Sequence, residues 1–255
     1  MKQSKRTFRT YAIGIATLAA LLIMWDMAII LFKFNPALFP SPLEVFLSVG
    51  ELRHLFGDIG VSMLRLLAGS TVGIVLGVAL GLITAKWIAA LESIGAAMHF
   101  FRFIPPLALI PLFLVWMGTG ETAKIAVLAW TTFFPVWLST HDAILHISRH
   151  YGLLTKSLRI KTGFLLKQVL FRGSLASILT SARVGIGITF SVLVAAEMLG
   201  AYAGIGYRIA LFQSVYQVDR MIAYILVLGI LGFLLDKIVA LVSARLTRWK
   251  QGAGD

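Results

Sequence analysis

The residues of this sequence most able to do chemistry are ionisable side chains within or beside long apolar stretches. They are Asp26, Arg65, Arg102, Arg183, Glu197 and Asp236. Long apolar stretches are typical of membrane spans, and a charge inside a membrane is costly, so such residues are functional candidates by default. Glu197 stands out because it lies near the outer end of its apolar stretch. The segment between Glu197 and Arg208 contains Gly200, Gly204 and Gly206, which predict a tight re-entrant loop. A proton-driven carrier would cluster its carboxylates in mid-span, whereas these are scattered, which argues against proton coupling.

The sequence gives little evidence for a set of residues that does covalent chemistry or binds a metal. His141 and His146 lie five residues apart, a poor spacing for one metal-binding helix face, and no His-Glu-x-x-His pattern occurs. The Gly-x-Gly at 204–206 follows no strand, and no G-x-x-x-x-G-K-[ST] phosphate loop is found. Cysteine is absent, which excludes disulfides and thiolate catalysis. We therefore expect no enzyme activity, no metal and no cofactor bound by this chain.

Composition predicts an integral membrane protein. Hydrophobic residues make up 59% and charged residues 13% of the sequence, and the mean hydropathy is +0.90. Soluble domains are closer to half apolar and a quarter charged. The net charge of +12 could suit nucleic acid, but the cations flank apolar runs and fit membrane topology better. Backbone groups in lipid must be satisfied internally, so we predict an all-α bundle in one domain, 1–255.

The apolar runs predict six transmembrane spans of roughly 20 residues each. The spans fall near 11–32, 60–85, 96–117, 122–142, 177–199 and 220–243. The first could be read as a signal peptide, but it is longer than an h-region and lacks an Ala-x-Ala cleavage site. Fourteen Lys and Arg residues fall on one side and five on the other, which places both termini in the cytoplasm. The five outer cations are Lys33, Arg53, Lys124, Arg208 and Arg220.

The outer segment 33–58 and the second span carry unusual rigid or small residues. Prolines in the outer segment 33–58 predict a short interfacial helix beginning near Ser41 or Pro42. The second span has a four-residue glycine ladder that forms one helix face, made of Gly69, Gly73, Gly77 and Gly81. Such faces let backbones approach closely, so we expect a packing role against another span or a second subunit.

The third span contains Pro105, Pro106 and Pro111 beside Arg102. Prolines free backbone carbonyls, and irregular backbone at membrane depth is tolerated where it is buried in protein or lines a wet cavity. Two interpretations follow: a broken helix beside a solute pathway, or a bent packing helix. On the first, Arg102, the prolines and Glu197 are candidate pathway or gate residues. The cations Arg65, Arg102 and Arg183 would suit an anionic solute.

Residues 143–175 carry six cations and no acidic residue, so this segment should remain in the cytoplasm. Its cations are Arg149, Lys156, Arg159, Lys161, Lys167 and Arg172. Leu154 and Leu158 are four residues apart and could form an apolar ridge. A short helix of this kind could dock in a groove of a partner, or lie on anionic lipid headgroups.

Several motifs, taken together in order and spacing, resemble the permease subunits of ABC importers for nitrate, taurine, alkanesulfonates and related solutes. They are Leu-Phe-Pro-Ser-Pro-Leu-Glu-Val (38–45), the proline span, Gly-Thr-Gly-Glu-Thr-Ala-Lys (118–124), Thr-Ser-Ala-Arg-Val-Gly (180–185), Val-Ala-Ala-Glu-Met (194–198) and Gly-Ile-Gly-Tyr (204–207). The resemblance implies a type I importer permease fold in a bacterial inner membrane. It also implies a second permease copy, identical or different, two cytoplasmic ATPases that hold ATP and Mg, and a periplasmic solute-binding protein.

The resemblance further implies that a coupling helix within 143–175 seats on the ATPase. It gives this role to Leu153, Leu154, Lys156, Ser157, Leu158 and Arg159. The signature Glu, Gly and Pro positions of the family are occupied by Leu153, Arg159 and Arg172, which puts the docking details in question. The implied function is ATP-driven import of a small, anionic solute: a sulfonate or taurine first, nitrate or bicarbonate next, with an organic nutrient such as a pyrimidine or aromatic acid also open. An ATP-independent secondary carrier or channel is the alternative.

Overall fold

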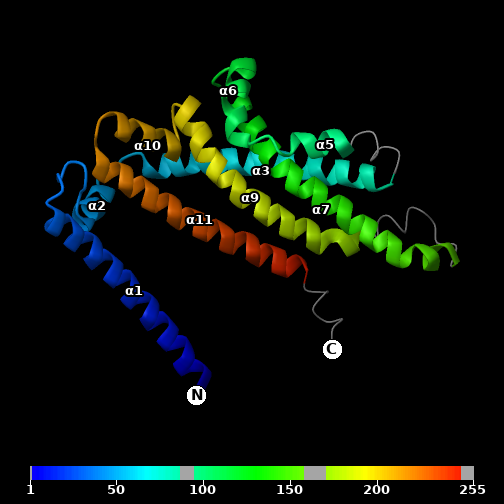
Figure 1. Ribbon diagram of the computed structural model, residues 1–255, viewed down its shortest axis with the longest axis horizontal. Helices are drawn as coiled ribbons and strands as arrows, with labels where there is room; N and C mark the ends of the chain where they lie inside the picture. Colours follow the sequence, from blue (N-terminus) through cyan, green and yellow to red (C-terminus); the bar gives the residue numbers. More distant parts are fainter. Residues whose placement is uncertain (1, 87–94, 158–170, 248–255) are drawn as a thin grey trace. The chain divides into compact units, whose positions relative to one another are not determined.

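The computed structural model describes residues 2–86, 95–157 and 171–247, and the regular structure in these ranges is helical throughout (Figure 1). The helices are α1 (Lys2–Phe32), α2 (Pro42–Val49), α3 (Leu55–Lys86), α5 (Ala96–Phe101), α6 (Pro106–Met117), α7 (Glu121–Ser157), α9 (Arg172–Gly200), α10 (Ile205–Ser214) and α11 (Val218–Leu246). By length and composition, Leu55–Ala85, α9 and α11 could each cross a membrane, and Ala19–Phe32 and α6 are shorter apolar helices. The fold is therefore that of an all-α integral membrane protein.

The chain forms two compact units. The first, which we call unit 1, comprises Met1–Leu55 and Arg208–Val227; the second, unit 2, comprises Phe56–Tyr207 and Leu228–Asp255. In unit 1, α2 begins where the sequence predicts. The Ser41 hydroxyl accepts from the Glu44 backbone N–H at 3.3 Å, while the Glu44 carboxylate accepts from the Ser41 N–H at 2.7 Å. With Pro42 at the first helical position, this capping box fixes the helix start.

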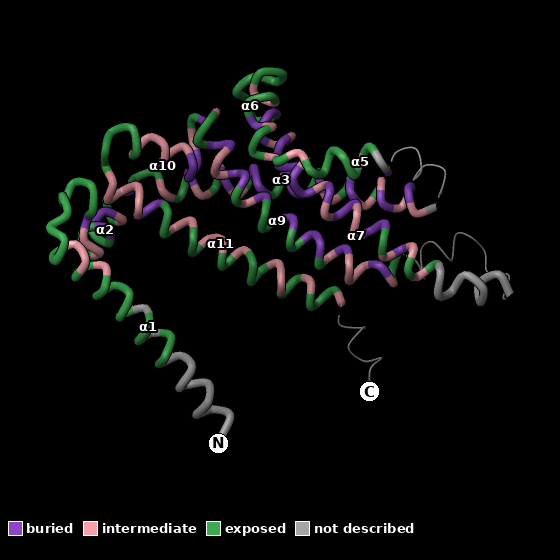
Figure 2. The backbone as a smooth tube through the Cα atoms, viewed as in Figure 1, coloured by how far each residue is buried: buried purple, intermediate pink, exposed green. Residues whose placement is uncertain are grey.

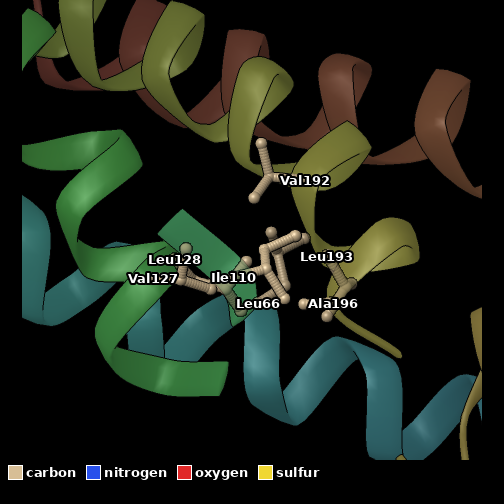
Figure 3. Packing of buried hydrophobic residues seen from close by; sticks show 7 residues of the cluster. All are labelled: Leu66, Ile110, Val127, Leu128, Val192, Leu193 and Ala196. Atoms are coloured by element: carbon tan, nitrogen blue, oxygen red, sulfur yellow. The ribbon is translucent and has the colours of Figure 1, made fainter. Parts of the chain in front are cut away.

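The core of unit 2 lies among α3, α6, α7 and α9. Its buried side chains are Leu66, Ile110, Val127, Leu128, Val192, Leu193 and Ala196 (Figure 3). Helices α7 and α9 run alongside each other (Figure 1), and buried stretches follow α3, α7 and α9 (Figure 2). These helices thus provide a rigid frame for the polar residues between them.

The glycine face of α3 packs against α7 of the same chain. A Cβ at Gly73 would lie 2.5 Å from the Ala129 carbonyl oxygen, and one at Gly77 would lie 2.8 Å from that of Phe133. The backbones approach so closely that neither position has room for a methyl group. The glycine ladder predicted packing against either another span of this chain or a second subunit, and the structure shows packing against another helix of this chain.

The predicted span 96–117 is two helices rather than one. Helix α5 ends at Phe101, and α6 starts at Pro106 after an extended Pro105 with φ −60° and ψ 125°. A residue followed by proline is disfavoured in the helical region, which explains why the break falls at Pro105-Pro106. Pro111 is accommodated inside α6. The helix is therefore broken rather than bent, and the solute pathway beside it stays a prediction.

Helix α7 also differs from its predicted bounds. The sequence predicts a span ending at 142 and a separate cytoplasmic segment from 143, but α7 continues without interruption to Ser157. The stretch after His141 contains no proline, and its only glycine before Ser157 is Gly152, so no strong helix breaker ends the helix at 142. The first part of the predicted coupling segment is therefore an extension of the preceding helix.

Candidate functional site

A buried ion-pair network joins α3, α7 and α9 in unit 2. Arg65 on α3 is 5% exposed, and Glu197 on α9 is fully buried. The Arg65 Nη1 donates to Glu197 Oε1 at 2.8 Å and to the Ala203 carbonyl at 2.6 Å. Its Nε and Nη2 donate to the two carboxylate oxygens of Glu121, each at 2.6 Å. One guanidinium thus uses its fork of donors to bind two carboxylates and a backbone carbonyl.

The turn before α7 positions Glu121 for this network. Gly118 has φ +78°, a conformation that favours glycine and that turns the chain from α6 into α7. Lys124 donates to the Thr119 carbonyl at 2.9 Å and lies 3.4 Å from Glu121 Oε1. The Arg65 hydrogen bonds lower the pKa of Glu121, which precedes the predicted span 122–142. Glu121 therefore stays ionised and forms the solvent-exposed side of the ion-pair network.

The opposite side of the network binds backbone N–H groups at the start of α10. The N–H groups of three successive residues are bound by side chains from α3 and α9: Gly204 by Asp58 at 3.1 Å, Ile205 by Ser62 at 2.9 Å, and Gly206 by Glu197 at 2.9 Å. Ser62 also donates to the Glu197 carboxylate at 2.8 Å. Two side chains distant in sequence, Asp58 and Ser62, and the nearby Glu197 therefore bind N–H groups at the start of the helix, which would otherwise be without intrahelical partners.

Gly204 and Gly206 are required by this arrangement. Gly204 has φ +114°, and a Cβ there would lie 2.5 Å from Glu197 Oε1. A Cβ at Gly206 would meet the Val194 carbonyl oxygen and would lie 2.8 Å from the Glu197 Cβ. The sequence predicts a tight re-entrant loop from Gly200, Gly204 and Gly206; in the structure Gly200 ends α9, and a short turn at Gly204 leads directly into α10.

A surface groove follows the broken helix of unit 2. It consists of three adjoining hollows of about 510, 430 and 470 Å³. Pro106 and Ile188 line both the first and the second, and Pro135 and Leu138 line both the second and the third. The hollows are therefore neighbours along α6, α7 and α9. We call this feature the proline groove.

The proline groove contains three of the predicted pathway residues. Arg102 and Pro106 line its middle hollow, and Pro105 lines the hollow at one end. Pro111 is not among the described residues that line it, and Glu197 is fully buried in the ion-pair network. Arg102 is exposed, with its guanidinium 4.8 Å from the centroid of the Phe103 ring. The middle hollow thus combines one cation with apolar and hydroxyl-bearing walls, whereas Asp142 and His146 line the hollow at the other end of the groove.

The three cations that would suit an anionic solute have different environments. Arg65 is engaged by Glu121 and Glu197. Arg183 on α9 forms a bidentate pair with Asp236 on α11, with both N–O distances 2.7 Å. Arg102 has no ion-pair partner among the residues described. Of the three, only Arg102 therefore combines exposure in a groove with an available charge.

The remaining predicted residues lie at the edge of the described structure. Leu158 and Arg159 are outside the described residues. The coupling residues Leu153, Leu154, Lys156 and Ser157 fall on the last turns of α7, where the side chains are outside the described part. Arg172 is the first residue of α9. Among the described residues, no group of three or more His, Asp or Glu side chains could hold a metal ion.

Sequence reasoning missed Asp58, Ser62 and Glu121 as partners of the network. The signal was present in part, because Asp58, Ser62 and Arg65 are spaced by four and three residues and so share one face of α3. Polar residues on one face of an otherwise apolar helix indicate a buried polar contact. The identity of the partner, 132 residues away in the case of Glu197, required the fold.

Comparison with known proteins identifies the fold and the family. Residues 69–248 match the family model described as the binding-protein-dependent transport system inner membrane component. The chain is 31% identical to the taurine transport system permease protein of Escherichia coli, over 94% of this chain and 90% of that protein. It is 28% identical to a putative aliphatic sulfonates transport permease of Bacillus subtilis, with 93% and 87% covered. It is 27% identical to a nitrate import permease of Synechocystis, with 89% and 86% covered.

A solved structure has the same fold. The methionine ABC transporter MetNI in an inward-facing conformation contains a chain that matches with a TM-score of 0.66 at 18% identity, covering 76% of this chain and 96% of that one. The relatives are transport permeases rather than enzymes. The chain therefore belongs to the binding-protein-dependent transport system inner membrane components, the permease subunits of ABC importers.

Proposed function

We propose that this permease passes a small anionic solute into the cell, with taurine or another alkanesulfonate as the first candidate and nitrate or bicarbonate next. The observation that carries the proposal is the middle hollow of the proline groove, which Arg102 lines as a cation without a described ion-pair partner and which has no acidic side chain among its described lining residues. A guanidinium binds oxyanions with directed N–H donors, and the apolar walls suit a short carbon chain. The relatives named for taurine, sulfonates and nitrate support this choice of solute class.

Energy for transport comes from two separate ATPase subunits that bind ATP and Mg. They dock on the coupling segment, including Leu153, Leu154, Lys156, Ser157, Leu158 and Arg159. The continuity of α7 supports this role, because one helix, with Pro135 in its interior, leads from the proline groove at Trp130 to Ser157. Movement of the docked end would then reach the groove through packed helix rather than through a loop.

The assembly further includes a second permease copy, either identical or a close variant, and a periplasmic solute-binding protein. In the proposed topology the chain lies in the inner membrane with both termini in the cytoplasm. The proline groove is open along its length in the single chain, so a second copy facing it would enclose a pathway.

Energy coupling is tested by reconstituting the permease with and without its ATPase partners in proteoliposomes and measuring uptake of radiolabelled taurine. We expect uptake only when the ATPases, ATP and the binding protein are present. Uptake by the permease alone, without ATP, would instead establish the secondary carrier or channel.

Docking is tested separately with Leu154→Asp plus Leu158→Asp, compared with Leu246→Asp, which changes an exposed leucine at the end of α11, beyond the predicted span 220–243. We expect the first variant to lose co-purification of the ATPase while remaining in the membrane fraction, and the second to retain it. An ATPase that still binds the double variant, with transport intact, rules out this coupling helix.

A further inference from the structure

A cleft of about 600 Å³ lies within unit 1, on residues that the proposed pathway does not use. It is bounded by the segment after α2, by α10 and by the first turns of α11. The lining residues with functional side chains are Glu51, Arg53, His54, Arg208, Arg220 and the aromatic pair Phe212 and Tyr224. Its volume is in the range of small-molecule sites. We call it the arginine cleft.

The arginine cleft is strongly cationic. Three arginines line it, whereas Glu51 is the one acidic side chain among its described lining residues. Glu51 Oε2 accepts from Arg220 Nη2 at 2.6 Å, and Arg220 Nη1 donates to the Gln217 side chain at 3.2 Å. A guanidinium has five N–H donors, so these two contacts leave donors of Arg220 for a ligand. Arg53 is exposed at the rim.

Part of the lining is aromatic. The Phe212 and Tyr224 rings pack with their centroids 5.7 Å apart, and Tyr224 is 1% exposed. Phe212 is partly exposed, so an apolar group entering the cleft could cover its ring. The cleft therefore offers two kinds of recognition: guanidinium groups for an oxyanion, and an aromatic surface for a hydrocarbon segment.

We propose that the arginine cleft is a second binding site, on the permease itself, for a small organic oxyanion such as an alkanesulfonate or a carboxylate. The oxyanion lies between Arg53 and Arg220, and the carbon chain lies on Phe212. In the proposed topology Arg53, Arg208 and Arg220 are outer residues, so the cleft meets the solute before the membrane. That placement rests on the proposed function, whereas binding to the cleft does not.

The two kinds of recognition predict an order of ligands. Butanesulfonate and taurine both carry an oxyanion and a carbon chain, whereas nitrate has the oxyanion alone. Removal of about one CH₂ group from apolar contact costs roughly 0.8 kcal/mol, or about fourfold in affinity. Nitrate should therefore bind at least tenfold more weakly than butanesulfonate, and Phe212→Ala should narrow that difference.

The test is isothermal titration calorimetry of the full chain in nanodiscs of neutral lipid, with butanesulfonate as the probe and nitrate as the comparison. We expect saturable binding of butanesulfonate that weakens tenfold or more in Arg53→Gln. Arg245→Gln on α11 is the matched control, because Arg245 is exposed and lies outside the cleft. Glu51→Gln removes the competing carboxylate and should tighten binding severalfold, a gain that misfolding cannot produce.

Two outcomes would overturn the proposal. One is the absence of saturable butanesulfonate binding to the wild type, or equal binding by Arg53→Gln and Arg245→Gln. The other is binding of anionic lipid alone. If phosphatidylglycerol added to the disc is retained through Arg53 and butanesulfonate does not displace it, the cleft binds a lipid headgroup. Because the assay uses neither ATP nor the ATPase, a failed transport experiment leaves its result intact.

Discussion

Replacing Glu197 by Gln tests whether the buried network holds unit 2 together at the α9–α10 turn. Glu197 is fully buried, and its carboxylate accepts from Arg65, Ser62 and the Gly206 N–H. Glutamine keeps the shape but removes the charge, and its NH₂ group must face one of these donors. Breaking a buried ion pair by changing one partner costs about 3–5 kcal/mol. Arg65 keeps both bonds to Glu121, so we expect the lower end, about 3 kcal/mol.

The matched control is Glu121→Gln, which removes a carboxylate from the same guanidinium. The Glu121 side chain is 56% exposed, so solvent screens its ion pair and the expected loss is about 1 kcal/mol or less. For a protein of this size, 1 kcal/mol corresponds to roughly 2–4 °C in Tm. Thermal unfolding of the detergent-solubilised chain should therefore show a decrease in Tm of about 6–12 °C for Glu197→Gln and of at most about 2–4 °C for Glu121→Gln.

A double variant separates the ion pair from general loss of packing. The double variant Arg65→Gln plus Glu197→Gln removes both buried charges. Its loss of unfolding free energy should therefore be smaller than the sum of the losses in the two single variants. Equal decreases for Glu197→Gln and Glu121→Gln, or strict additivity in the double variant, would refute the view that Arg65 and Glu197 form one buried unit.

Further predictions concern single positions. Gly73→Ala should lower Tm, because its methyl group would lie 2.5 Å from the Ala129 carbonyl and overpacking costs about 1–3 kcal/mol, whereas Gly187→Ala has open space and should not. Gly204→Ala should lower Tm and increase protease cleavage at 200–206, since Gly204 has φ +114° and its Cβ would strike the Glu197 carboxylate; Gly229→Ala, in open space, is the control. Arg65 lowers the pKa of Glu121 below its ordinary 4.5. The ion pair therefore stabilises the folded state fully when the pH is above the pKa that Glu121 has in the unfolded chain. This stabilisation is lost as the pH falls through the lower pKa that Glu121 has in the folded chain. The Tm difference between wild type and Glu121→Gln should accordingly shrink as the pH is lowered from 6 to below 4.5, and a constant difference would contradict the ion pair.

Local signals in the sequence predicted much of the fold. The start of α2 is set by Ser41, Pro42 and Glu44 within a few residues of one another, so no distant contact is needed to find it. The break between α5 and α6 likewise follows from Pro105-Pro106, because the proline rings act on their immediate neighbours. The glycine ladder of α3 indicated close packing for the same reason, although not its partner.

Features that depend on distant residues could not be predicted. The sequence placed Glu197 among the pathway candidates, but its neighbours Ser62 and Arg65 come from more than 130 residues away and bury it. Arg183 and Arg102 look alike in sequence, and only the fold pairs Arg183 with Asp236. The continuation of α7 past 142 was missed because a charge-based topology boundary need not coincide with the end of a helix.

The central claim is that the proline groove carries an anionic solute past Arg102, and uptake by the reconstituted importer tests it most directly. A hydrogen bond to a charged group contributes about 1.5–3 kcal/mol, or roughly 10- to 150-fold. We predict that Arg102→Gln reduces taurine uptake at least tenfold with the complex still assembled, that Arg102→Lys restores part of it, and that Arg245→Gln has no effect. Uptake by Arg102→Gln at the wild-type rate would contradict the claim.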